Sequence, residues 1–165
     1  MGFSTGSQLQ KLLETLPQKG KVVWIGIRPV KQGVLKPLLE ADALENKGLE
    51  GDHYSLGKGS KRQVTLIMQE HLLTIASILE IVQLDPGLLR RNIVVSGINL
   101  FSLKDKKFKL GDSILEYTGE CHPCSRMETN LGNGGYNAVR GHGGITAKIL
   151  QGGKIKLNDQ LAYIL

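Results

Sequence analysis

Apolar residues along this 165-residue chain fall mostly in short runs that are broken by glycine and polar residues. Val22–Ile27 is a compact run rich in β-branched residues, and Arg28-Pro29 ends it, which predicts a strand. Further short strands are predicted at Leu38–Leu44, Gln63–Ile67, Ile93–Val95, Phe108–Leu110, Ser113–Tyr117, Ile145–Leu150 and Leu161–Leu165.

Two segments instead show helical periodicity. Met68–Val82 carries Leu72, Ile75, Ala76, Leu79 and Val82 along one face, which predicts the main helix of the chain. Ser4–Leu16 repeats leucine at helical spacing behind Ser and Thr caps and ends before Pro17, which predicts a short N-terminal helix.

Many short strands with glycine turns and few helices favour a mainly β (α+β) fold of barrel-like form. Residues 48–59 are glycine-rich and polar and are predicted to form a loop. The chain contains no internal repeat and no Pro-rich linker. We therefore expect a helical extension at residues 1–20 and a single domain over residues 21–165.

Composition narrows the possible partners. The hydrophobic fraction is 41%, the charged fraction 22% and the net charge +6, which suits an anionic ligand. Aromatic residues make up only 5%, so platforms for base stacking are scarce and nucleic acid is not an expected partner. No apolar stretch approaches the roughly 20 residues of a membrane span and no secretory signal is visible, so we expect a cytoplasmic protein that does not contact membranes.

Several common catalytic motifs are absent from the sequence. The glycines of Gly57–Gly59 lack the spacing of a phosphate-binding P-loop, and residues 132–144 contain no G-x-G-x-x-G. Neither a G-x-S-x-G nucleophile elbow nor an H-E-x-x-H zinc motif occurs. These absences leave the cysteines as the main candidates for chemistry.

Both cysteines lie in the segment Glu120-Cys121-His122-Pro123-Cys124. Their C-x-x-C spacing allows a dithiol–disulfide couple, although no βαβ pattern surrounds it. It also allows half of a zinc site, although no histidine pair supplies the remaining ligands. A single reactive thiolate that binds a soft metal or carries sulfur is a third possibility, and two unreactive packed thiols are a fourth.

A second candidate group is Arg90-Arg91-Asn92, which immediately precedes the predicted strand Ile93–Val95. Such a group is often only the solvated start of a strand. Guanidinium forks nevertheless match phosphate and planar anions, and asparagine supplies both a donor and an acceptor.

Taken in order, several segments resemble the MOSC domain, which occurs at the C-terminus of eukaryotic molybdenum-cofactor sulfurases and as small bacterial proteins. They are Gly48–His53, Arg62–Leu66, Arg90–Ile93 with Gly97 and Leu100, Leu110–Asp112, Pro123-Cys124, Gly143–Ile145 and Asn158-Asp159. The resemblance runs from about Gly48 to the C-terminus. It implies a barrel-like domain related to the pyruvate-kinase β-barrel.

The resemblance also implies a pocket for the pyranopterin molybdenum cofactor. The essential cysteine of the family matches Cys124, which would be both the catalytic residue and the molybdenum ligand. Arg90 and Asn92 match residues that hold the phosphate and pterin of the cofactor, and Arg91 is a typical neighbour in bacterial members. Asp52, His53, Arg62 and, more weakly, Glu50 fall in segments that approach the same pocket.

Three functions follow as hypotheses. The first is a molybdenum-dependent reductase of N-hydroxylated small molecules, such as hydroxylaminopurines, supplied by an external electron-donor protein. The second is a sulfur or cofactor carrier that forms a persulfide on Cys124, with a cysteine desulfurase as partner. The third is a metal-free redox module using Cys121 and Cys124. Cys121 lies outside the family signature and is interpreted as a packing residue, and no pyridoxal phosphate site is expected.

Overall fold

The computed structural model describes residues 6–56 and 60–165, and its centre is a closed β-barrel. One sheet runs in the order β11-β7-β8-β9-β5-β6-β1-β2, and the additional pairing of β11 with β1 closes seven strands into a barrel. Only β5 and β6 run parallel to each other among these pairs. A smaller sheet has the order β10-β3-β4. The mainly β, barrel-like prediction is therefore confirmed.

The barrel strands are β1 (Gly20–Ile27), β5 (Val64–Met68), β6 (Ile93–Ser96), β7 (Lys107–Leu110), β8 (Ser113–Glu120), β9 (Ile145–Gln151) and β11 (Gln160–Ile164). The remaining strands are β2 (Lys36–Leu38), β3 (Glu40–Leu44), β4 (Gly48–Leu49) and β10 (Gly153–Lys156). The α-helices are α1 (Gln8–Glu14), α2 (Gln69–Ile78), α3 (Ser125–Leu131) and α4 (Gly135–Val139). Short 3-10 helices cover His53–Leu56 (η1), Pro86–Leu89 (η2) and Leu100–Leu103 (η3).

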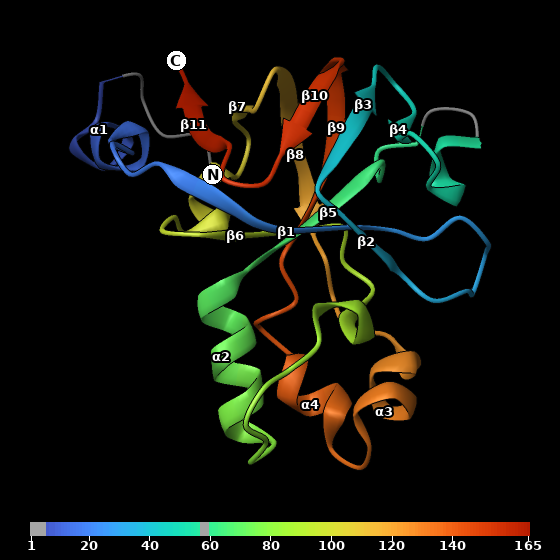
Figure 1. Ribbon diagram of the computed structural model, residues 1–165. Helices are drawn as coiled ribbons and strands as arrows, with labels where there is room; N and C mark the ends of the chain where they lie inside the picture. The colour runs from blue at the N-terminus through green and yellow to red at the C-terminus, as the bar shows by residue number, and fades with distance from the viewer. Residues whose placement is uncertain (1–5, 57–59) are drawn as a thin grey trace.

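The helices α2, α3 and α4 gather at one end of the barrel, below it in Figure 1. The helix α2 lies within the connection from β5 to β6, and the parallel pairing of these strands requires such a crossover. Leu72, Ile75 and Ala76 form its buried face. Two apolar clusters result, one inside the barrel around Leu66 and Phe108 and one between the barrel and the helices.

Several predicted elements differ from the observed ones. The predicted single strand Leu38–Leu44 is two strands, because β2 pairs with β1 whereas β3 pairs with β10. The helix predicted to reach Val82 ends at Ile78, and Glu80 adopts a left-handed φ of 55°. The helices α3 and α4 and the strands β4 and β10 were not predicted.

The predicted N-terminal helix is observed over Gln8–Glu14, with Ser7 accepting the main-chain N–H of Gln10, whereas residues 4–5 of the prediction lie outside the described residues. No residue of α1 is buried, so its leucines do not pack against the barrel. Residues 57–59 of the predicted loop also lie outside the described residues.

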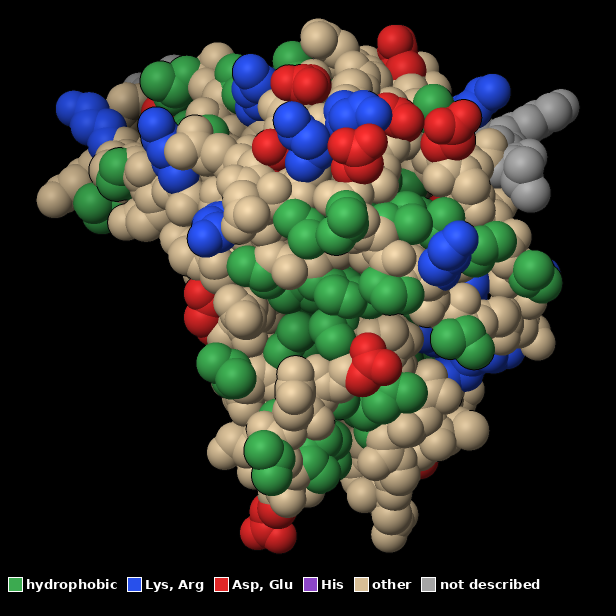
Figure 2. Space-filling view, viewed as in Figure 1, with side chains coloured by type: hydrophobic (Ala, Val, Ile, Leu, Met, Phe, Trp, Pro, Cys, Tyr) green, Lys and Arg blue, Asp and Glu red, His purple; other side chains and the backbone are tan. Residues whose placement is uncertain are grey.

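Apolar side chains also gather on the outer surface, in the middle of the face shown in Figure 2, between the barrel and the helices. A groove of about 260 Å³ is lined there by residues of β1, α2 and β6 and the segment after α2, including Val23, Trp24, Leu73, Val82 and Val94. This groove shares no lining residue with the pocket that contains Cys124.

Candidate functional site

A cavity of about 190 Å³ brings together residues from six parts of the sequence. It is lined by Arg28, Leu35, Asp52, Tyr54, Arg62, Thr65, Arg90, Arg91, Asn92, His122, Cys124 and Met127. All the site residues predicted from the sequence are in this set except His53. His53 lies behind the lining, with its Nε2 at 3.2 Å from Nη2 of Arg28. Glu50, the weakly supported candidate, is exposed and does not line the cavity.

The two cysteines occupy different environments. Cys124 is exposed, lines the cavity and is the N-cap residue of α3. Cys121 directly follows β8 and is only 2% exposed. Its main-chain N–H donates to the carbonyl of Gly144 at 2.8 Å, and its sulfur accepts a hydrogen bond from Nη2 of Arg62 at 3.4 Å. Both thiols are free, and Cys124 is the one that a ligand in the cavity can reach.

Arg91 is buried and each nitrogen of its guanidinium donates to a main-chain carbonyl. Nε donates to Gly143 at 2.7 Å, Nη1 to Leu89 at 2.7 Å and Nη2 to Cys121 at 3.3 Å. Burial lowers the pKa of Arg91, and the nearby Cys121 opposes this shift. Arg91 therefore ties the cysteine segment and the glycine segment before β9 to the start of β6.

Arg90 points differently from its neighbour because it adopts a left-handed φ of 60° at the end of η2. It lines the cavity and is half-buried, and its Nε has no hydrogen-bond partner among the described residues. The adjacent Arg90 and Arg91 thus have separate environments, one open to a ligand and one bound to main-chain carbonyls.

Asn92 uses its whole amide within the protein. Its Oδ1 accepts from the main-chain N–H and the hydroxyl of Thr65, both at 3.1 Å. Its Nδ2 donates to the carbonyl of Gly26 at 3.1 Å and to Oδ1 of Asp52 at 3.4 Å. Two acceptor positions and two donor hydrogens are the full capacity of an asparagine side chain.

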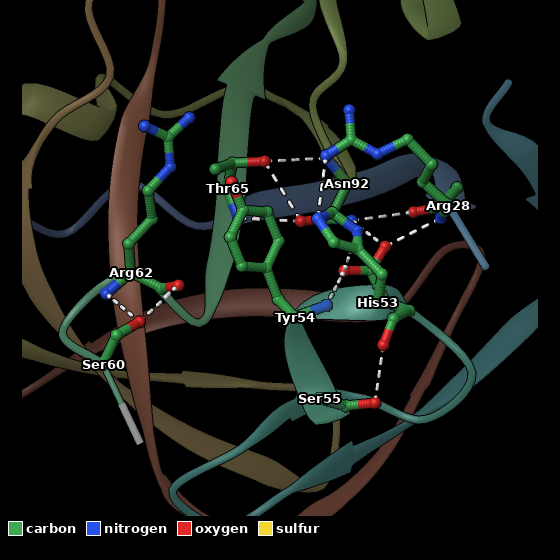
Figure 3. Close-up of polar contacts among 10 residues, drawn as sticks. Arg28, His53, Tyr54, Ser55, Ser60, Arg62, Thr65 and Asn92 are labelled. Atoms are coloured by element: carbon green, nitrogen blue, oxygen red, sulfur yellow. Dashed lines mark hydrogen bonds and ion pairs between the residues drawn. The ribbon is translucent and has the colours of Figure 1, made fainter. Parts of the chain in front are cut away.

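Asp52, His53 and Arg28 form a second network beside Asn92, part of which is visible in Figure 3. Asp52 is buried and accepts the main-chain N–H of Arg28 at 2.7 Å and that of Tyr54 at 3.2 Å. Nη2 of Arg28 lies 3.2 Å from Nε2 of His53. Because a guanidinium can only donate, this contact requires a neutral His53 whose proton is on Nδ1, 3.8 Å from Oδ2 of Asp52.

Arg62 lies just before β5. In the view of Figure 3, the rings of Tyr54 and His53 lie between Arg62 and Arg28. It is exposed, and its main chain is held by the Ser60 hydroxyl, which accepts from Arg62 N at 3.2 Å and donates to Arg62 O at 3.0 Å. Its guanidinium reaches the sulfur of Cys121 from this position. Arg62 therefore places a positive charge between the buried thiol and the cavity.

Sequence reasoning missed six lining residues: Arg28, Leu35, Tyr54, Thr65, His122 and Met127. Arg28 was interpreted only as the end of a strand. The feature of the sequence that could have identified Arg28 is its position as a charged residue directly after a strand with the buried residues Ile25 and Ile27. Such a side chain must leave the barrel at its rim, which is where the cavity lies.

The cavity combines an exposed thiol with guanidinium groups from Arg28, Arg62 and Arg90, whereas the carboxylate of Asp52 is occupied by main-chain donors. This set of side chains suits an anionic ligand that also offers a soft metal or sulfur to Cys124. Over residues 6–56 and 60–165, no group of three or more His, Cys, Asp or Glu side chains is arranged to hold a metal ion.

Comparisons with known proteins agree on the fold. Residues 53–162 match the family model described as the MOSC domain. The YuaD protein from Bacillus subtilis superposes with a TM-score of 0.74 at 20% identity, covering 89% of this chain and 97% of that one. YiiM from Geobacillus stearothermophilus (TM-score 0.67, 15% identity, 88% and 75% covered) and YiiM from Escherichia coli (0.65, 17%, 88% and 70%) have the same fold.

No curated protein matches this sequence. Within the described part of the chain, none of the helices has the length and apolar character needed to cross a membrane.

Proposed function

The chain belongs to the MOSC domain family, and from this premise we propose that its cavity binds the pyranopterin molybdenum cofactor and that the loaded protein reduces N-hydroxylated small molecules. The observation that carries the proposal is that an exposed Cys124 and four arginines line one cavity at the barrel rim. In this proposal an external donor protein supplies the electrons.

The residues present fit the cofactor. Cys124 offers a soft thiolate to the metal, and Arg28 and Arg90 retain buried guanidinium nitrogens without partners among the described residues. When bound, the cofactor would supply a metal centre capable of oxygen-atom transfer and redox chemistry. Cys124 would hold the metal, while the arginines would orient the anionic groups of the cofactor.

The rigid surroundings of Cys124 support this role. The segment that carries it is fixed at Cys121 by the main chain of Gly144 and by Arg91. Cys124 itself begins α3, whose Met127 is fully buried against the barrel. A thiol placed in this way keeps its position without closing the cavity, which is what a metal ligand at an open site needs.

The proposal is tested by the metal and pterin content of protein purified without oxygen from a host that makes the cofactor. Wild type is compared with Cys124→Ala and with Cys121→Ala, which removes the buried thiol instead. We expect near-stoichiometric molybdenum and pterin in wild type, loss of molybdenum in Cys124→Ala and retention in Cys121→Ala. Absence of both from wild type, while a control molybdoenzyme in the same host is loaded, would contradict the proposal.

A second candidate function is supported by the exposure of Cys124, which leaves its sulfur open to another protein. In this function Cys124 receives sulfur from a cysteine desulfurase as a persulfide and passes it on. Mass spectrometry after incubation with a desulfurase distinguishes the two functions. A persulfide on Cys124 without reductase activity favours the carrier, whereas reductase activity without a sulfur adduct favours the enzyme.

A further inference from the structure

We propose that Arg28, together with Arg90, forms an anion subsite in this cavity that binds a phosphomonoester, and that Asn92 is not a ligand of that group. The inference deepens the proposed function and rests on it for the source of the phosphate. It departs from the assignment implied by the family resemblance, in which Arg90 and Asn92 hold the phosphate and pterin.

The first argument is the state of the Arg28 side chain. Arg28 is only 5% exposed and lines the cavity, yet its Nε and Nη1 have no hydrogen-bond partner in the described part of the chain. The ion pairs found among residues 6–56 and 60–165 do not include it. A buried guanidinium without a counter-charge is costly, so an anionic ligand would stabilise it strongly.

The neighbours of Arg28 cannot supply that charge. His53 must be neutral at Nε2 to accept from Nη2 of Arg28. The carboxylate of Asp52 faces the main-chain N–H groups of Arg28 and Tyr54 instead of the guanidinium. The network therefore fixes one nitrogen of Arg28 and leaves the other two for a ligand.

Arg90 provides the second half of the subsite. It lines the same cavity, and its Nε is likewise buried without a partner among the described residues. Two guanidinium forks suit a phosphate because they can donate several charge-assisted hydrogen bonds to its oxygens. Asn92 has no such capacity, since its four hydrogen-bonding positions are used by Thr65, Gly26 and Asp52.

The test measures binding of inorganic phosphate, by isothermal titration calorimetry at constant ionic strength, to the full chain purified from a host without the cofactor. We expect Arg28→Gln and Arg90→Gln each to weaken phosphate binding by about tenfold or more. Arg140→Gln, at an exposed arginine outside the cavity, controls for the change in net charge and leaves the affinity unchanged. Circular dichroism shows whether each variant is folded, and Arg90→Gln, at a half-buried position, keeps the test valid if Arg28→Gln does not fold.

Equal phosphate affinity in wild type, Arg28→Gln and Arg90→Gln would overturn the subsite, as would equal weakening by Arg140→Gln.

The phosphomonoester could belong either to the cofactor or to an anionic substrate. Phosphate binding to the cofactor-loaded protein distinguishes these two sources. If loading abolishes phosphate binding, the cofactor occupies the subsite, and if binding persists, the subsite serves the substrate. Phosphate binding that depends on Arg28 in a protein that takes up no molybdenum would retain the subsite and refute the proposed function. Molybdenum uptake that depends on Cys124, together with a phosphate affinity that Arg28→Gln does not change, would support the proposed function and refute the subsite.

Discussion

The guanidinium Nε of Arg91 donates to the carbonyl oxygen of Gly143 at 2.7 Å, across 52 positions of sequence. The same side chain reaches the carbonyls of Leu89 and Cys121, so one buried cation satisfies three main-chain acceptors. Arg91 thereby attaches two segments to the start of β6: the cysteine segment through Cys121 and the glycine segment before β9 through Gly143. Arg91 positions the candidate ligand Cys124 indirectly, through Cys121.

Replacing Arg91 by leucine should therefore destabilise the whole site. The substitution leaves three buried carbonyls unpaired, and we expect a loss of roughly 3 kcal/mol or more in the free energy of unfolding. Urea denaturation measures it. Arg140→Leu, at an exposed arginine that contacts only Asn137 among the described side chains, should change the free energy by about 0.5 kcal/mol or less. Equal losses for the two variants would show that the Arg91 contacts contribute no specific stability.

Gly144 is predicted to be intolerant of any side chain. It has a φ of +85°, and an added Cβ would lie 2.0 Å from the carbonyl oxygen of Leu66. Gly141 is a matched control because its φ is +80° and no atom of the described structure lies within 4 Å of the added Cβ. We expect Gly141→Ala to cost about 1–2 kcal/mol from backbone conformation alone and Gly144→Ala to cost well above 4 kcal/mol.

Calorimetric melting temperatures of the two glycine variants provide the comparison. A similar decrease for both would mean that the contact with Leu66 relaxes easily and that only φ matters.

Thr65→Val tests the network that fixes Asn92. Valine has nearly the shape of threonine but lacks the hydroxyl, which donates to Oδ1 of Asn92 at 3.1 Å and accepts from its main-chain N–H at 3.0 Å. We expect a loss of about 0.5–1.5 kcal/mol, since Oδ1 of Asn92 loses one of its two donors and the main-chain N–H of Asn92 keeps only the carbonyl of Thr65 as acceptor. Thr129→Val, on the exposed side of α3, is the control, and unfolding curves that coincide for both variants would contradict the network.

The barrel strands were predictable because their apolar runs are short, β-branched and interrupted by turns. The segment Ser125–Val139 was not predictable as two helices, because glycines separate them and α4 has only five residues. Its order depends on a contact that no local pattern reveals, namely the carboxylate of Glu128 accepting main-chain N–H groups of Gly134 and Tyr136.

The site was predicted unevenly for a similar reason. Cys124 and Arg90 were identified from a resemblance in the sequence, and both line the cavity. Arg28 was missed because its environment is created by Asp52 and His53, 24 and 25 positions away. Gly143 allows the main chain of Cys121 to approach closely, and Gly144 does the same for the main chain of Leu66, which no local pattern in the sequence reveals.

The Glu128 contact predicts a pH dependence of stability. Main-chain hydrogen bonds from Tyr136 and Gly134 lower the pKa of Glu128 from its ordinary value of 4.5. A lowered pKa in the folded state means that the stabilisation is fully present above pH 4.5 and is lost as the pH falls through the folded-state pKa.

Glu128→Gln should accordingly be less stable than wild type at pH 7, and the difference should shrink below pH 4.5. Urea denaturation of both proteins from pH 7 to pH 3 measures it. A difference that stays constant over this range would show that the charge of Glu128 has no part in holding the turn between α3 and α4.

Molybdenum K-edge X-ray absorption of cofactor-loaded protein tests whether Cys124 is a ligand of the metal, as we propose. Wild type is compared with Cys124→Ser, which keeps the size of the side chain and replaces sulfur by oxygen. We expect the variant to have one sulfur ligand fewer than wild type at the metal. The same number of sulfur ligands in both proteins would contradict it.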